Sequence, residues 1–119
     1  MSLDLLALTS RYHEALNHYD EATVKAMFAP DAVYVSKGVN GRIEGRDAIL
    51  TAFTAYFHEH PDQYAEDEGV EILSSHVVRF AWKLEATARS TGKRVTRRGV
   101  ETVTYDDDGL IAHVEVIDR

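Results

Sequence analysis

Glu101 is the residue of this chain best suited to acid–base chemistry. It lies in an alternating run from Arg94 to Tyr105 that predicts a β-strand. Val103 and Tyr105 share its face, and we therefore expect Glu101 to point into the interior. Desolvation there disfavours the charged carboxylate and raises a carboxyl pKa. Such a group can donate a hydrogen bond when protonated or act as a base near neutral pH. The alternative is a structural ion pair with Arg97 or with another inward basic group.

The single tryptophan, Trp82, is a candidate for the wall of a pocket. It shares one face of an alternating run with apolar residues, and the simplest interpretation of that face is core packing. If the fold leaves a cavity, Trp82 would line it together with Phe28 and Phe53. Such a wall would favour flat or apolar ligands.

The six histidines lack the spacing of metal ligands. His58 and His60 flank Glu59 on a predicted helix, where residues two apart diverge by about 200°. Helical metal ligands stand four apart on one face. The stretch from Gly38 to Gly41 lacks the lysine and the following helix start of a phosphate-binding loop. We therefore expect no metal and no cofactor.

Composition argues against several classes of partner. The chain has 119 residues, 45% hydrophobic and 28% charged, and we expect one globular domain over residues 1–119. Acidic residues outnumber basic ones 20 to 13, so a nucleic-acid partner is not expected. No apolar run is long enough to span a bilayer, and no membrane partner is expected. The absence of cysteine makes a cytoplasmic location the default.

Hydrophobic periodicity predicts helices in the first half of the chain and strands in the second. The expected helices cover residues 3–18, 20–28 and 47–59. The expected strands cover residues 32–35, 70–75, 77–87, 94–105 and 110–117. Turns are expected at Gly38, Asn40 and Gly41, and hairpin turns at residues 91–93 and 107–109. This order indicates an α+β fold with the helices packed on one face of the sheet.

Three motifs in order give the chain a resemblance to a known family. FAPDA follows the second expected helix, GRIEGRDAI leads into the third, and YDDDGLI turns the last hairpin. From Arg11-Tyr12 to Asp118, the chain resembles the NTF2-like superfamily and, within it, the SnoaL-like and ketosteroid-isomerase-like proteins. The resemblance implies a cone-shaped, cystatin-like barrel: a curved antiparallel or mixed sheet with three N-terminal helices in its concave face. It also implies an apolar cavity and homodimers packed through the outer sheet face.

The resemblance also implies site residues. The isomerases place a tyrosine donor in the first helix and a protonated acid in the penultimate strand, and Tyr12 and Glu101 occupy these positions. Tyr12 could instead be a core tyrosine with its hydroxyl bound to a neighbour. The aspartate base of the isomerases corresponds to Ser36, which cannot abstract a proton without a partner base. SnoaL-like proteins use an acid on a late strand, so Asp118 is a reserve candidate unless the chain end frays.

We therefore expect a small apolar or cyclic ligand. One interpretation is a SnoaL-like polyketide cyclase, or a ketosteroid-isomerase-like isomerase or lyase that lacks the usual aspartate base. The alternative is a non-catalytic ligand-binding or dimerisation module of the same fold. The residues expected to line the pocket are Phe28, Tyr34, Ser36, Phe53, Trp82, Val103 and Val114.

Overall fold

The computed structural model describes residues 3–36 and 41–119, which form three helices and six strands. The helices are α1 (Leu5–Asn17), α2 (Glu21–Met27) and α3 (Arg46–Glu59). The strands are β1 (Phe28–Ser36), β2 (Gly41–Glu44), β3 (Tyr64–Ile72), β4 (Val77–Thr87), β5 (Arg94–Tyr105) and β6 (Ile111–Asp118). The turns expected at Gly38 and Asn40 lie outside the described residues. None of the helices in the described ranges is long and apolar enough to cross a membrane.

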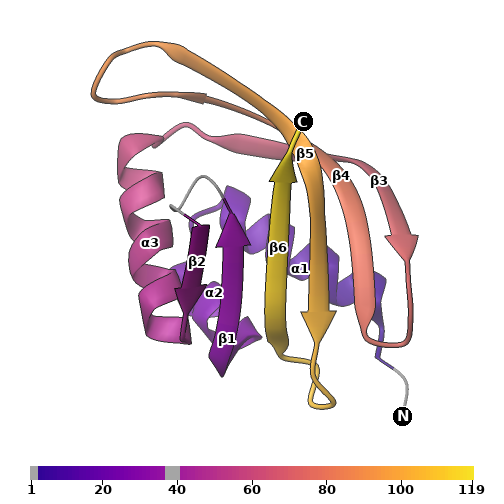
Figure 1. The fold of residues 1–119 in the computed structure, drawn as a ribbon. Coiled ribbons are helices and arrows are strands. Elements are labelled where there is room, and N and C mark those ends of the chain that lie inside the picture. The colour runs from indigo at the N-terminus through magenta and orange to yellow at the C-terminus, as the bar shows by residue number, and fades with distance from the viewer. Residues whose placement is uncertain (1–2, 37–40) are drawn as a thin grey trace.

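The six strands form one mixed sheet in the order β2-β1-β6-β5-β4-β3. β1 and β6 pair in parallel, and the other neighbouring strands pair antiparallel. The sheet is curved and does not close on itself, and all three helices lie on one face of it (Figure 1). The far end of the β4–β5 hairpin bends over α3, where the backbone N–H of Arg89 donates to the carbonyl of Glu59 at 2.7 Å. The expected α+β architecture is therefore confirmed.

Helix α1 fixes one wall of the interior. Asp4 caps it by accepting a hydrogen bond from the backbone N–H of Ala7 at 3.1 Å, which satisfies one of the free donors of the first turn. Its buried residues follow a spacing of three or four and are Leu5, Thr9, Tyr12 and Ala15. This spacing makes one stripe that faces the sheet. Tyr12 has no exposed surface, so its ring is held in the interior by the packing of α1 against the sheet.

The two edge strands differ from the sequence expectation. The sequence does not predict β2, and the strand expected over residues 70–75 instead runs from Tyr64 to Ile72. The β3 sequence YAEDEGVEI is acidic and has no apolar alternation, because this edge strand is largely exposed. Its extended conformation comes from pairing with β4 rather than from its own side chains. β1 also begins four residues earlier than expected, at Phe28 rather than Ala32.

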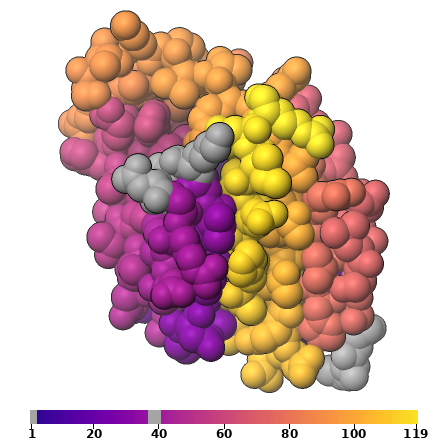
Figure 2. Space-filling view, viewed as in Figure 1, coloured from indigo at the N-terminus to yellow at the C-terminus, as the bar shows by residue number. Residues whose placement is uncertain are grey.

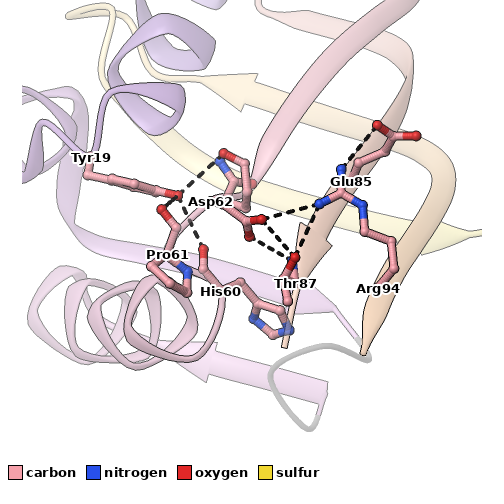
Figure 3. Close-up of polar contacts among 8 residues, drawn as sticks. Tyr19, His60, Pro61, Asp62, Glu85, Thr87 and Arg94 are labelled. Carbon is pink, nitrogen blue, oxygen red and sulfur yellow. Dashed lines mark hydrogen bonds and ion pairs between the residues drawn. The ribbon is translucent and has the colours of Figure 1, made fainter. Parts of the chain in front are cut away.

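Asp62 fastens the β4–β5 hairpin to the segment between α3 and β3 (Figure 3). Its carboxylate accepts hydrogen bonds from the backbone N–H of Thr87 at 2.6 Å and from the Thr87 hydroxyl at 2.8 Å, and it pairs with Arg94 at 3.2 Å. The two hydrogen bonds from Thr87 lower the pKa of Asp62 below its ordinary value. In the same region the Tyr19 hydroxyl donates to the Pro61 carbonyl at 2.6 Å. The junction thereby joins the segment after α1 to the loop before β3 and the hairpin.

Gly99 lets the inner layer of the sheet pack closely. It is buried on β5 and is the direct partner of Trp82 on β4. A Cβ atom at position 99 would overlap the carbonyl oxygen of Ile117 and would lie 2.7 Å from Cζ2 of Trp82. The indole therefore occupies the space that any larger residue at this position would need.

We expect Gly99→Ala to destabilise the protein by about 1–3 kcal/mol, because the added methyl group must displace either the Ile117 backbone or the indole of Trp82. Urea denaturation measures the change. Gly69→Ala is the matched control, since an added Cβ at that strand glycine meets no atom within 4 Å. Equal stability of the two variants would show that Gly99 is not required for this packing.

Candidate active site

A cavity of about 110 Å³ lies between the helices and the inner face of the sheet. Its walls come from α1, α3, β1, β3, β4, β5 and β6. The aromatic residues of the wall are Tyr34, Phe53, Tyr56, Phe57, Phe80 and Trp82. The ionisable residues other than tyrosine are His13, Asp67, Arg97 and Glu101. The cavity thus combines aromatic surface with a few groups that can exchange protons.

Glu101 lies on the β5 wall of this cavity. The residue is 8% exposed, and its Oε1 atom has no hydrogen-bond partner among the described residues. Burial raises the pKa of Glu101 to about 7; the charge of Asp67 acts in the same direction, whereas His13 and Tyr12 oppose it. The carboxyl group is therefore partly protonated near neutral pH. In that state it can donate a hydrogen bond, and in the ionised state it can accept a proton.

Tyr12 lies on α1 next to Glu101 but does not itself line the cavity. Its hydroxyl approaches Glu101 closely enough to lower the pKa of that carboxyl. The two groups do not reach the geometry of a well-formed hydrogen bond, and the Tyr12 hydroxyl has no other partner among the described residues. Burial, together with the neighbouring Glu101 carboxyl, raises the pKa of Tyr12 well above its ordinary value. Tyr12 is therefore a neutral phenol whose hydroxyl lies close to Glu101 without a hydrogen bond to it.

Arg97, also on the cavity wall, pairs with Asp118 and not with Glu101. Its Nε lies 2.9 Å from Oδ2 of Asp118 and its Nη2 lies 2.8 Å from Oδ1, which makes a two-pronged ion pair between β5 and β6. The guanidinium carbon also lies 5.4 Å from the ring centre of Trp82. Of the structural alternatives for Glu101, the ion pair with Arg97 is therefore absent, whereas His13 is an inward basic group close enough to lower the pKa of Glu101. Asp118 is engaged outside the cavity wall.

The residues expected to line the pocket fall into two groups. Those on the cavity wall are Tyr34, Ser36, Phe53 and Trp82. Those in the core, with no exposed surface and no place on the wall, are Phe28, Val103 and Val114. Val103 and Val114 are direct partners in the β5–β6 register. The Phe28 ring packs between those of Tyr12 and Phe53, with ring centres 5.8 and 6.0 Å away.

Two polar residues of the cavity wall, His13 and Asp67, are not among the site residues predicted from the sequence. Nδ1 of His13 lies 2.9 Å from Oδ2 of Asp67, which joins α1 to β3. The imidazole also packs against the ring of Phe80, with ring centres 4.1 Å apart. His13 lies beside the apolar stripe of α1 rather than on it, and Asp67 belongs to an acidic strand that the sequence does not predict there. The contact between His13 and Asp67 therefore arises only from the tertiary structure.

We expect the unpaired Glu101 to make stability depend on pH. Its folded-state pKa of about 7 lies above the ordinary value of 4.5, so between these pH values the folded protein keeps a proton that the unfolded chain has lost. The contribution of Glu101 is most favourable below about pH 4.5, declines up to about pH 7 and is then lower by about 3 kcal/mol. Glu101→Gln removes this dependence.

The stability of Glu101→Gln relative to the wild type should therefore increase from about pH 4.5 to about pH 7, as measured by urea denaturation. Glu115→Gln, an exposed position on β6, is the control and should show little such trend. A difference between Glu101→Gln and the wild type that stays constant with pH would contradict the buried, unpaired carboxyl.

Solved structures of the same fold cover nearly the whole chain. An NTF2-like protein of unknown function from Exiguobacterium sp. 255-15 has a TM-score of 0.82 at 17% identity, with 94% of this chain and 98% of that chain covered. A Δ5-3-ketosteroid isomerase from Mycobacterium sp. has a TM-score of 0.81 at 20% identity, with 94% and 90% covered. A Mycobacterium tuberculosis protein in complex with estradiol-17β-hemisuccinate has a TM-score of 0.82 at 18% identity, with 93% and 90% covered. At these identities the likeness establishes the fold.

The family is established by the sequence itself. No curated protein sequence matches the chain. The family model for the SnoaL-like domain matches residues 9–114, a range that includes both Tyr12 and Glu101. Together with the NTF2-like architecture of its structural neighbours, this match shows that the chain belongs to the SnoaL-like domain family.

Proposed function

We propose that the protein binds a small apolar or cyclic molecule through an oxygen atom of that ligand and acts on it by acid–base chemistry, as a SnoaL-like enzyme of the cyclase or isomerase type. The observation that carries the proposal is the buried Glu101 carboxyl, which faces a cavity with aromatic walls and has an oxygen without a partner among the described residues. A buried polar atom of this kind costs free energy unless another group satisfies it. A ligand carbonyl or hydroxyl group would do so.

Protonated Glu101 is the donor in this proposal. When the carbon next to a ligand carbonyl loses a proton, negative charge develops on the carbonyl oxygen. A donor already fixed in a site shielded from water stabilises that charge. The Tyr12 hydroxyl lies close to Glu101, and both this hydroxyl and the indole Nε1 of Trp82 are buried donors without a partner in the described part of the chain.

The size of the cavity limits the enclosed part of the ligand. Its volume is about 110 Å³. A dry cavity of about 150 Å³ holds a benzene molecule. The enclosed part of the ligand is therefore about one ring in size, and a larger ligand would extend through the opening of the cavity. This comparison favours one-ring ketones and phenols as the first probes.

The names of two structural neighbours support a cyclic ligand. One was solved with a steroid derivative, estradiol-17β-hemisuccinate, and the other is a Δ5-3-ketosteroid isomerase. Ser36 occupies the position that the resemblance gives to the isomerase base. The proposal therefore does not assign proton abstraction to residue 36. Ser36 also favours the second candidate function, a binding or dimerisation module that performs no chemistry.

The proposal includes a homodimer packed through the outer sheet face. Figure 2 shows this face, which the helices leave uncovered. Charges on it pair within the chain, as between Arg79 and Glu71 at 2.6 Å and between Arg98 and Glu68 at 3.3 Å. Ile117 is 55% exposed there and offers apolar contact area. Such a face can complement a second copy of itself across a two-fold axis.

The donor role of Glu101 is tested with 4-nitrophenol, a one-ring ligand with an oxygen atom, by calorimetric titration at about pH 6, below the raised pKa of Glu101. Glu101→Gln keeps a donor and is expected to bind within a few-fold of the wild type. Glu101→Leu removes the donor and is expected to bind roughly tenfold more weakly or worse. Glu115→Gln serves as the control outside the cavity. Wild-type affinity in Glu101→Leu would exclude the proposed contact.

A further inference from the structure

The hydrogen bond between His13 and Asp67 fixes the proton on one nitrogen of the imidazole. Nδ1 of His13 lies 2.9 Å from Oδ2 of Asp67. An ionised carboxylate only accepts hydrogen bonds, so in the form of the pair that has a neutral ring and an ionised Asp67, Nδ1 carries the proton and Nε2 keeps a lone pair. The edge contact with the ring of Phe80 restricts rotation of the imidazole. The structure therefore presents a basic nitrogen in a defined orientation.

This basic nitrogen lacks a partner. Nε2 of His13 is buried and has no hydrogen bond within the described ranges of the chain. His13 and Glu101 line the same cavity, and the two side chains are close enough that a protonated His13 lowers the pKa of Glu101. Buried polar atoms in proteins are nearly always satisfied, so an unsatisfied one at a cavity wall indicates a group that a ligand meets. A residue that can accept a proton and a residue that can donate one thus line the same cavity.

We propose that His13 is the general base of this site and that Asp67 positions it. The inference rests on the proposed function, because it assumes that the cavity binds a carbonyl compound. It assigns the base to α1 rather than to residue 36. Glu101 then serves as the protonated donor and not as the base.

The step needs no co-reactant. Nε2 of His13 takes a proton from the carbon next to the ligand carbonyl; the C–H electron pair forms a C=C bond, and the C=O π pair moves to the oxygen. The Glu101 O–H donates a hydrogen bond to the enolate oxygen. Asp67 stabilises the imidazolium that forms. Return of the proton from Nε2 to a different carbon of a conjugated enolate restores the carbonyl group and the neutral ring, which completes an isomerisation.

This chemistry identifies a substrate class, a cyclic ketone with an acidic C–H next to its carbonyl group and a double bond one carbon further on. The test uses 3-cyclohexen-1-one, which meets these requirements in one ring. NMR in heavy water follows deuterium uptake at the carbon beside the carbonyl, and ultraviolet absorbance follows formation of the conjugated ketone. We expect the wild-type protein to accelerate deuterium uptake.

His13→Gln is expected to slow uptake by about a hundredfold or more, the usual contribution of a general base. Its affinity for 4-nitrophenol should stay within a few-fold of the wild type. His18→Gln makes the same chemical change at an exposed position at the end of α1 and should react as the wild type does.

The outcomes separate the two proposals. Wild-type rates in His13→Gln would overturn the role of His13, as would a wild-type protein that binds 4-nitrophenol without accelerating deuterium uptake. Both results leave the binding function in place. A wild-type protein that does not bind 4-nitrophenol would instead overturn the proposed function.

Asp67 acts through His13 and is tested by coupling. Asp67→Asn is expected to slow uptake by on the order of tenfold or more, because the ring can then carry its proton on the wrong nitrogen. The double variant with His13→Gln should be no slower than His13→Gln alone. ¹⁵N NMR of His13 should show the proton on Nδ1 in the wild type and a mixture of tautomers in Asp67→Asn. Glu66→Gln, on the neighbouring exposed position, is the control; additive losses would contradict a shared role.

Discussion

The burial of the Glu101 carboxyl without an ion pair among the described residues is the interaction on which the rest of this structure depends. An ionised carboxylate in such a place is costly, and the group responds by holding its proton to a pKa of about 7. The nearest potential counter-cation on the same strand, Arg97, is held in a two-pronged ion pair by Asp118. This arrangement leaves Glu101 available as a donor. Burial of the Glu101 carboxyl lowers the stability of the folded protein at neutral pH and leaves a group that can exchange a proton.

The fold holds that group from several sides. The apolar stripe of α1 brings Tyr12 against Glu101. The pairing of Phe80 with Glu101 and of Trp82 with Gly99 places two aromatic rings beside the carboxyl on the inner face of the sheet. The curved sheet and the helices then enclose a space of about 110 Å³ rather than a filled core. Each of these elements packs through its own apolar residues, and the cavity is the space that remains between them.

Much of this arrangement is predictable from the sequence, and the exceptions have physical causes. Alternation predicts the inward face of β5, because Val95, Val103 and Tyr105 share the face that also carries Glu101. β3 could not be placed, since an exposed edge strand needs no apolar alternation. Because the predicted strand begins at residue 70 rather than at Tyr64, Asp67 is not recognised as a strand residue near the site. The sequence could not assign a role to His13. This residue lies beside the apolar stripe of α1, and its partner Asp67 belongs to a strand that comes close only in the folded protein.

A few side chains of the cavity region differ from those that the resemblance to the isomerases leads us to expect. Ser36 lies at the cavity wall where the resemblance expects an aspartate base, whereas the donor positions keep Tyr12 and Glu101. His13 and Asp67 stand at the other side of the cavity wall, on α1 and β3. Under the two proposals made above, the fold keeps its donors while proton abstraction is assigned to different elements.

With a pKa of about 7, the Glu101 carboxyl of the folded protein keeps its proton well above the pH at which exposed glutamates lose theirs. Carboxyl-¹³C-labelled glutamate, followed by NMR across a pH titration and assigned with Glu101→Gln, tests it directly. The account predicts that one glutamate signal, missing from the variant, titrates with a pKa of about 7. If the signal assigned to Glu101 titrates with the exposed glutamates at about 4.3, the carboxyl is solvated or paired, and the account is wrong.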